Sequence, residues 1–568
     1  MTIRDYFDRA VREVPNAVFQ RFHDGSAWVE KTYADVRGRV DRAAALVRRC
    51  LAEASLADAE ETAAAGFPVG RRVAIMLENS PDWQALYMAV AGSGMAVVPI
   101  DPKLRAVEVK HILTDSGAMA IFFGGKQREV VDEASEELPA LVKVADPSAL
   151  LDSIEAGEIA EAVAWYEAHR PTDDTLASLI YTSGTTGRPK GAMLTHANFT
   201  SNAEATCRRV PFYATDNFLN VLPLFHAFSF MGNFLLPLAV RGSTSFIRSL
   251  RTVADDMLEV KPTVLLAVPL LAEKLYQRID QNIKKSFISA GLFKLDFARK
   301  LIARKIVERF GGKMRIIGIG GAPTSVETLE GFQKIGLFVL EGYGITECSP
   351  GVAYPDPADF HPGTVGPVLD NIAYKIVDTD DTRAGELLVK GPNVMRGYWR
   401  NPAQTAAAFD AEGYYKTGDI VRLEQGCVKI CGRTKALIVN REGKNIYPEE
   451  IEHALEHAPL IKDAIVVGYR VGREVGEHVG AIIVPDEDAV KAHLKEKSLT
   501  REEIRNFIVE YAQGVCRARV ADYKQPRKFV VQFEPLERTS TMKVRRVIYA
   551  GTLDEAPAHS AAAVATDA

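Results

Sequence analysis

Residues 181–191 read Tyr-Thr-Ser-Gly-Thr-Thr-Gly-Arg-Pro-Lys-Gly, a run with three glycines, four serine or threonine hydroxyls, an arginine and a lysine. Glycine lets the backbone approach an oxyanion closely, hydroxyls donate hydrogen bonds, and the Lys190 ammonium adds a positive charge. The apolar run 176–180 precedes this segment and predicts a buried strand. Ligands of α/β sheets bind where such strands end. The sequence therefore predicts a phosphate-binding loop at this position.

The spacing differs from that of a P-loop NTPase, because Gly191 follows Lys190 and no serine or threonine stands there for Mg²⁺. On these residues the segment resembles the phosphate loop of the adenylate-forming superfamily, which contains acyl-CoA synthetases, nonribosomal-peptide adenylation domains and firefly luciferase. The resemblance implies an ATP site that includes Thr182, Ser183, Gly184, Thr185, Thr186, Gly187 and Lys190.

Composition sets the broad class of the protein. The chain has 568 residues, of which 47% are hydrophobic and 25% charged, so it can bury several cores. A net charge of −5 argues against a nucleic-acid partner. The first residues lack an apolar signal core, and the longest apolar run, 264–272, is too short to span a bilayer. We expect a globular, cytoplasmic protein with reduced thiols.

Apolar runs and helical patterns alternate along the first third of the chain. Residues 73–77, 96–99 and 118–123 predict strands, and residues 81–91 and 105–115 predict helices between them. This alternation is typical of right-handed crossovers and a parallel α/β sheet.

Two further segments resemble the adenine-binding region of the superfamily. Residues 315–323 predict a strand that enters a glycine turn, and the resemblance assigns Gly321, Ala322 and Pro323 to the nucleotide. Residues 339–347 resemble the motif in which a tyrosine flanks the adenine, a threonine meets the α-phosphate and a glutamate binds Mg²⁺. In this sequence the motif implies roles for Gly342, Tyr343, Gly344, Thr346 and Glu347.

The acyl site is expected after residues 221–226, which predict a strand that ends with His226. A lone histidine beside apolar residues is more often a core residue, but Pro-Leu-Phe-His resembles the family motif that borders the acyl pocket. The following stretch, 227–236, contains Phe230 and Gly232 and no charged side chain. An amino-acid substrate needs an acid near its ammonium. This stretch therefore favours a fatty or aryl acid.

Short β-runs separated by Gly, Pro and Asp turns over residues 364–432 predict a small antiparallel barrel. Within it, Tyr-Lys-Thr-Gly-Asp at 415–419 resembles the ribose-binding motif, with Asp419 as the acceptor. Residues 432–435 resemble the hinge between the two domains, in which Arg433 reaches the nucleotide and Lys435 is the pivot.

Beyond the hinge the pattern becomes α+β. Residues 440–445 resemble the loop that enters the site for thioester formation, which implies Gly443 and Lys444. Residues 535–543 resemble the loop that carries the adenylation lysine, Lys543. The family mostly has Pro at 537 and Gly at 542, where this chain has Glu537 and Met542.

The fold class expected from these elements is α/β. A large N-terminal AMP-binding domain, 1–432, holds parallel α/β subdomains to about residue 350 and the barrel from about 360 to 432. A smaller, mobile α+β domain spans 433–555, and a disordered tail spans 556–568. Residues 284–310 form a basic amphipathic segment, which is typical of ordinary surface helices and also of helices that contact an anionic membrane face.

The resemblance implies an AMP-forming ligase that uses ATP, Mg²⁺ and CoA, with His226, Thr346, Glu347 and Lys543 as catalytic residues. The apolar stretch favours a medium- or long-chain fatty acid. The alternatives are an aryl or alicyclic acid, an acyl carrier protein as thiol acceptor and, from a different class, an ATP-binding sensor without catalysis. A sensor would have no reason to keep both Lys543 and the hinge.

Overall fold

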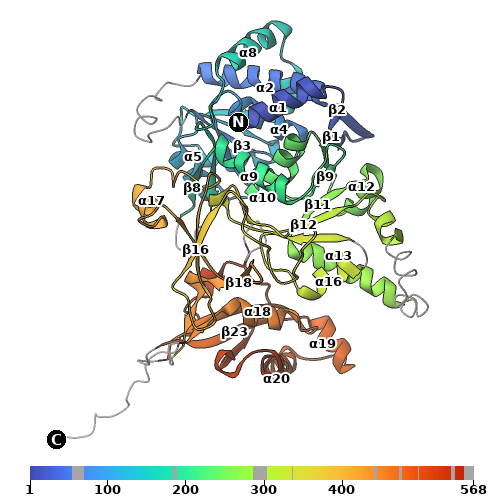
Figure 1. The fold of residues 1–568 in the computed structure, drawn as a ribbon, viewed down its shortest axis with the longest axis vertical. Coiled ribbons are helices and arrows are strands. Elements are labelled where there is room, and N and C mark those ends of the chain that lie inside the picture. The colour runs from blue at the N-terminus through green and yellow to red at the C-terminus, as the bar shows by residue number, and fades with distance from the viewer. Residues whose placement is uncertain are drawn as a thin grey trace, which may run out of the picture.

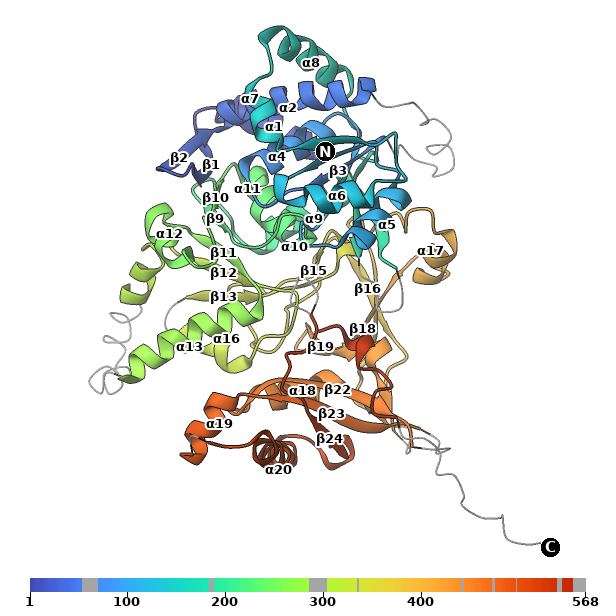
Figure 2. The same cartoon turned by 180° about the vertical axis from the view of Figure 1, so that it is seen from behind.

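A computed structural model describes residues 1–53, 70–182, 188–285, 304–334, 337–440, 444–471, 476–496, 498–538 and 544–554. In Figures 1 and 2 the blue-to-green part of the chain forms one large body with two sheets, and the orange and red part forms a smaller body beneath it. The yellow and light-orange strands lie between the two bodies. The predicted α/β class is confirmed.

The first sheet contains the strand that precedes the phosphate loop. Its strands run parallel except the last one, which pairs antiparallel with its neighbour. Every residue of the three strands β3, β4 and β5 is buried, as expected for a parallel sheet covered on both faces. In spatial order the strands are β6 (Val142–Ala145), β5 (Ala120–Phe123), β3 (Arg72–Met76), β4 (Ala96–Pro99), β7 (Leu176–Thr182) and β8 (Lys190–Thr195).

The second sheet is built from distant parts of the chain. It is parallel except for its edge strand β2. Two N-terminal strands join it, because β1 pairs with β10 more than two hundred residues later. In order its strands are β13 (Phe338–Glu341), β12 (Ile316–Ile319), β11 (Val264–Ala267), β9 (Asn217–Asn220), β10 (Ser243–Phe246), β1 (Val18–His23) and β2 (Trp28–Thr32).

Helices cover these sheets and begin at recognisable caps. The Ser80 hydroxyl accepts the Trp83 N–H at the start of α4, where Pro81 occupies the first turn. The predicted helices 81–91 and 105–115 are confirmed to within one residue. The helices of this body are α1 (Ile3–Glu13), α2 (Tyr33–Glu53), α4 (Pro81–Ala91), α5 (Ala106–Ser116), α6 (Arg128–Ala134), α7 (Pro147–Asp152), α8 (Ala156–Ala168), α9 (His196–Arg209), α10 (Ala227–Phe230), α11 (Leu236–Val240), α12 (Val253–Val260), α13 (Pro269–Lys285) and α16 (Val326–Lys334).

The strand predicted to end at His226 ends at Asn220 instead. Pro223 has no N–H to continue a ladder. The side chain of Asn79 replaces the ladder, because it donates to the Leu222 carbonyl and accepts from the Leu224 N–H, both at 2.8 Å. His226 therefore precedes α10 as its N-cap.

Four antiparallel strands stand where the barrel is predicted. They are β16 (Ala373–Val377), β17 (Gly385–Lys390), β18 (Tyr415–Glu424) and β19 (Cys427–Arg433), and the short helix α17 (Pro402–Ala408) lies between the second and third. The chain also pairs along the outer edge of β19, since Val365 donates to and Gly366 accepts from Val428, each at 2.8 Å.

The C-terminal body has its own core. Thr500 and Glu503 form a capping box at the start of α20 (Arg501–Arg519), because each side chain accepts the other residue's N–H. Tyr447 crosses to the four-stranded sheet, where it is buried beside Ile420 and donates to Asp380 at 2.7 Å. The elements are α18 (Pro448–Glu456), β22 (Ile461–Tyr469), β23 (His478–Pro485), α19 (Glu487–Leu494), α20 (Arg501–Arg519) and β24 (Lys528–Val531).

Candidate active site

The phosphate-loop segment connects two antiparallel strands. Thr182 at the end of β7 pairs with Lys190 at the start of β8, so the two strands that flank the segment are paired with each other. In a P-loop, by contrast, the turn leads from a strand into a helix. The predicted residues Ser183, Gly184, Thr185, Thr186 and Gly187 lie outside the described residues.

Lys190 is held at the edge of the candidate site. Its ammonium donates to Gln404 Oε1 at 2.6 Å and lies 5.2 Å from the ring centroid of Tyr398. Partial burial, and then the nearby charge of Lys435, lower the pKa of the Lys190 amine below its ordinary value, while the Glu347 carboxylate opposes this shift. The predicted hinge residue Lys435 and the phosphate-loop lysine are therefore close enough to repel each other. A bound polyanion would relieve that repulsion.

Glu347 stands in the 3-10 turn Thr346–Cys348, which follows the short strand β14 (Tyr343–Gly344). Its Oε1 accepts a hydrogen bond from the Tyr398 hydroxyl at 3.0 Å. Among the described residues no hydrogen bond or ion pair engages Oε2. A half-buried carboxylate with one oxygen left for a cation fits a Mg²⁺ ligand.

Asp419 forms the most buried part of the site, with a side chain that is 3% exposed. Strand register places it opposite Arg433, whose guanidinium lies 2.9 Å from Oδ1, and the Tyr343 hydroxyl donates to Oδ2 at 2.5 Å. The Asp419 carboxylate raises the pKa of Arg433. Burial, and then the Asp419 carboxylate, raise the pKa of the Tyr343 phenol well above its ordinary value. The structure thus joins three of the predicted nucleotide residues.

The predicted adenine segment, residues 315–323, includes β12 and the turn that follows it. Gly321, Ala322 and Pro323 are exposed, and Gly321 has a φ of +93°, which favours glycine. Two other predicted glycines sit where a side chain has no room. A Cβ on Gly342 would lie 2.5 Å from the Tyr354 ring, and one on Gly344 would lie 2.2 Å from the Pro350 carbonyl oxygen.

Glu341, the last residue of β13, is a site-adjacent acid that the sequence pattern did not single out. It is 5% exposed, and its Oε1 accepts the Thr324 N–H at 2.7 Å, which ties the turn after β12 to the strand beside it. Burial raises the pKa of this carboxyl to about 7.

A Glu341→Gln variant tests this shift. A raised folded-state pKa means that the protonated carboxyl stabilises the fold fully below the unfolded pKa and that this contribution is lost as pH rises through about 7. The amide does not ionise, so the parent should lose about 3 kcal/mol relative to the variant between pH 5 and pH 8. Thermal midpoints of both proteins across this range measure the difference. Parallel profiles would contradict the assignment.

The apolar stretch after His226 meets the adenine segment. His226 is partly exposed, and the Phe228 ring lies 3.2 Å from where a Cβ of Gly320 would stand. Gly232 belongs to the π-helical turn Met231–Leu235, and a Cβ there would overlap Leu266 at 1.8 Å. Such turns occur often at functional sites.

Phe230 points into the protein core. It is 3% exposed. Its ring centroid lies 4.5 Å from that of Tyr87, 5.0 Å from that of Phe199 and 5.5 Å from that of Phe234. Phe228 is the aromatic residue of this stretch that faces the adenine segment. Sequence alone does not separate the two, because α10 is a single turn and its direction depends on the packing around it.

Two predicted loops of the C-terminal body are described only in part. Lys444 lies with its ammonium 4.9 Å from the ring centroid of Tyr523, and its N–H donates to Asn440. Gly443 and Lys543 lie outside the described residues, as do residues 286–303 of the basic segment and the tail 556–568. No helix among the described residues combines the length and apolarity needed to cross a membrane.

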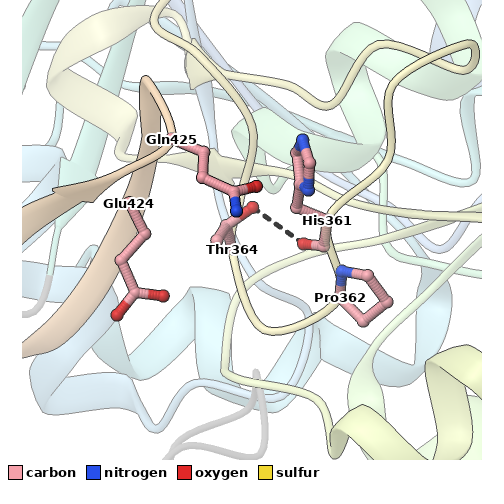
Figure 3. Close-up of a pocket in the computed structure, with 5 residues that line it drawn as sticks. All are labelled: His361, Pro362, Thr364, Glu424 and Gln425. Atoms are coloured by element: carbon pink, nitrogen blue, oxygen red, sulfur yellow. Dashed lines mark hydrogen bonds between the residues drawn. The ribbon is translucent and has the colours of Figure 1, made fainter.

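Figure 3 shows a surface pocket of about 490 Å³ that is lined by other residues. None of its lining residues belongs to the predicted site. Glu424 is paired with Arg422 and Lys429, and Thr364 donates to the His361 carbonyl. The pocket is lined by His361, Pro362, Thr364, Glu424 and Gln425.

Known proteins match both bodies of the chain. The model of the AMP-binding enzyme family matches residues 7–399, and that of the AMP-binding enzyme C-terminal domain matches residues 450–543. The chain belongs to the AMP-binding enzyme family. Its resemblance to the adenylate-forming superfamily is thereby confirmed.

Several relatives of this AMP-binding enzyme carry activity names. The long-chain-fatty-acid–CoA ligase FadD15 of Mycobacterium bovis is 33% identical, with 94% of this chain and 92% of the relative covered. A long-chain-fatty-acid–CoA ligase of Escherichia coli is 30% identical, with 85% of each chain covered. The solved structure of ATP-bound MatB from Rhodopseudomonas palustris is 25% identical and covers 97% of this chain and 98% of its own, with a TM-score of 0.72.

Proposed function

We propose that this AMP-forming acid–CoA ligase activates a medium- or long-chain fatty acid with ATP and then transfers the acyl group to CoA. The observation that carries the proposal is a convergence: Lys190, Glu347 and the Asp419–Arg433 pair are close enough to interact electrostatically. The Phe228 ring, from the apolar stretch 227–236 without charged side chains, lies against Gly320 of the predicted adenine segment. The two curated relatives named above support the same acid class.

Different residues bind different parts of the nucleotide. Asp419 accepts from the ribose hydroxyls, and the Tyr343 ring flanks the adenine beside the exposed turn 321–323. Thr346, Lys190 and residues 182–187 hold the phosphates. Glu347 would hold Mg²⁺, which would supply positive charge to the phosphates. Catalysis of this kind is mostly positioning and charge, because the phosphoryl group needs little covalent help.

Adenylation makes the acid reactive. A carboxylate oxygen attacks the α-phosphorus of ATP, pyrophosphate leaves, and an acyl-AMP mixed anhydride remains. We assign Lys543 to the charge that develops between the acid oxygen, the α-phosphate and the leaving pyrophosphate.

Thioester formation follows in a second arrangement. The CoA sulfur attacks the acyl carbonyl carbon, and AMP leaves. We infer that the domain beyond residue 432 rotates about Lys435, which withdraws Lys543 and brings in Gly443 and Lys444. We also propose that the two domains meet at residues 432–433. His226, Phe228 and Gly232 stand at the acyl side of the site.

An acid panel with ATP and CoA tests the function. The products should be AMP and pyrophosphate. We expect kcat/KM to rise with chain length until the acyl site is full, because each added buried CH₂ should lower the activation free energy by about 0.8 kcal/mol. Acetate, an aryl acid and an amino acid serve as matched controls, and a carrier protein serves as the alternative thiol.

The panel tests the reaction mechanism, the class of acid and the thiol acceptor. ADP and phosphate as products would exclude the adenylate mechanism. A preference for an aryl acid or for acetate would remove the fatty-acid assignment and keep the reaction class. Faster transfer to the carrier protein than to CoA would replace the acceptor.

A further inference from the structure

Tyr398 lies where three functional segments meet. Its hydroxyl donates to Glu347 Oε1 at 3.0 Å and lies 3.4 Å from the Tyr415 hydroxyl on β18. Its ring centroid lies 5.2 Å from Lys190 Nζ. One side chain therefore contacts the carboxylate proposed for Mg²⁺, the lysine proposed for the phosphates and the strand that carries Asp419.

The backbone around Tyr398 is fixed on two sides. Its segment pairs with β8, since the Met193 N–H donates to the Gly397 carbonyl at 3.0 Å and the Trp399 N–H donates to the Gly191 carbonyl at 2.8 Å. On the other side the Tyr398 N–H donates to Thr405 Oγ1 at 2.9 Å. Gly397 has a φ of +137°, and a Cβ there would lie 2.6 Å from Thr405 Cγ2. These contacts fix the backbone in a position from which the Tyr398 phenol reaches Glu347.

The direction of the hydrogen bonds follows from proton counting. A phenol ionises only at about pH 10, which is about three units above neutrality, so Tyr398 keeps its proton at neutral pH. A phenol has one proton, and a carboxylate only accepts, so Tyr398 donates to Glu347. Tyr415 is then the donor in the contact between the two hydroxyls. The chain Tyr415 to Tyr398 to Glu347 fixes the orientation of the carboxylate.

We propose that Tyr398 is a positioning residue that holds Glu347 Oε1 and so presents Oε2 to the Mg²⁺ of ATP, while its ring keeps Lys190 beside the phosphates. The proposal rests on the function proposed above. Groups that orient a metal ligand typically change metal affinity or activity by 10- to 100-fold when they are removed.

Tyr398→Phe separates the hydroxyl from the ring. Calorimetric titration with ATP, without any acid substrate, gives a readout that does not depend on turnover. Affinity for ATP in excess Mg²⁺ should fall about 10-fold or more, whereas affinity in EDTA should stay at the parent value. The Mg²⁺ concentration for half-maximal pyrophosphate release should rise in parallel, with a thermal midpoint close to that of the parent.

Two further variants isolate the contacts. Tyr415→Phe removes the outer hydroxyl and keeps the bond to Glu347, so its Mg²⁺-dependent loss should be smaller than that of Tyr398→Phe. Tyr398→Leu also removes the ring beneath Lys190, so it should lose ATP affinity in EDTA as well. An unchanged Mg²⁺ dependence in Tyr398→Phe, or an equal loss in Tyr415→Phe, would overturn the proposal.

Failure of this inference is distinguishable from failure of the proposed function. A parent enzyme that makes no AMP from ATP with any acid in the panel loses its proposed function. An active parent whose Tyr398→Phe variant binds ATP as tightly as the parent does, both in excess Mg²⁺ and in EDTA, keeps that function and loses only the role of Tyr398.

Discussion

Replacement of Lys543 by alanine should reduce acid-dependent exchange of pyrophosphate into ATP by about 10² to 10³ in rate, since one preorganised donor to developing charge is typically worth that much. The same variant should convert supplied acyl-AMP and CoA to thioester at close to the parent rate. The reason is that the proposed rotation about Lys435 carries Lys543 away before the second step. Isotope exchange and a thioester assay measure the two halves separately.

Lys435→Pro is the reciprocal control. Proline fixes φ at the pivot, so it should block rotation while adenylation persists. Equal slowing of both halves in Lys543→Ala would end the domain-alternation interpretation for this chain. It would also give weight to Glu537 and Met542, the two residues of the 535–543 loop that depart from the family pattern.

Asp419→Ala should weaken ATP binding by about 1 to 3 kcal/mol, the usual cost of losing a hydrogen bond that involves a charged group. The structure supports a large loss of affinity, because this carboxylate is 3% exposed and pairs with both Arg433 and Tyr343. Its removal leaves a guanidinium and a phenol without their acceptor at the nucleotide site. Calorimetric titration with ATP gives the affinity.

The thermal midpoint of the Asp419 variant separates binding from folding. Tyr343→Phe is the matched control, since it removes one donor to Asp419 and leaves the carboxylate and Arg433 in place. Unchanged ATP affinity in Asp419→Ala would move the ribose to another part of the site.

Local elements of the fold were predictable because their signals are local. The alternating strands and helices of residues 73–123 and the cap at Thr500 depend on neighbours in sequence. Sheet membership is not local in this sense. The strands of both sheets are short, and nothing in residues 18–23 indicates that β1 pairs with residues 244–245.

The candidate site follows the same division. The family resemblance implied Glu347 and Asp419 as single residues, but their partners come from elsewhere in the chain. Tyr398 precedes α17 and Tyr415 begins the next strand, and neither position shows in sequence that both hydroxyls reach toward Glu347. Glu341 was likewise hidden, because its raised pKa depends on burial against the turn at Thr324.

The hydrogen bond from Tyr447 to Asp380 favours one orientation of the C-terminal body. It spans the proposed hinge, and a hydrogen bond to a charged group contributes about 1.5 to 3 kcal/mol. Each 1.4 kcal/mol is a factor of ten in an equilibrium constant, so this one bond favours its orientation by about 10- to 100-fold over one in which it is broken. Under the proposed rotation about Lys435, the Tyr447 phenol would therefore contribute directly to the equilibrium between the two arrangements.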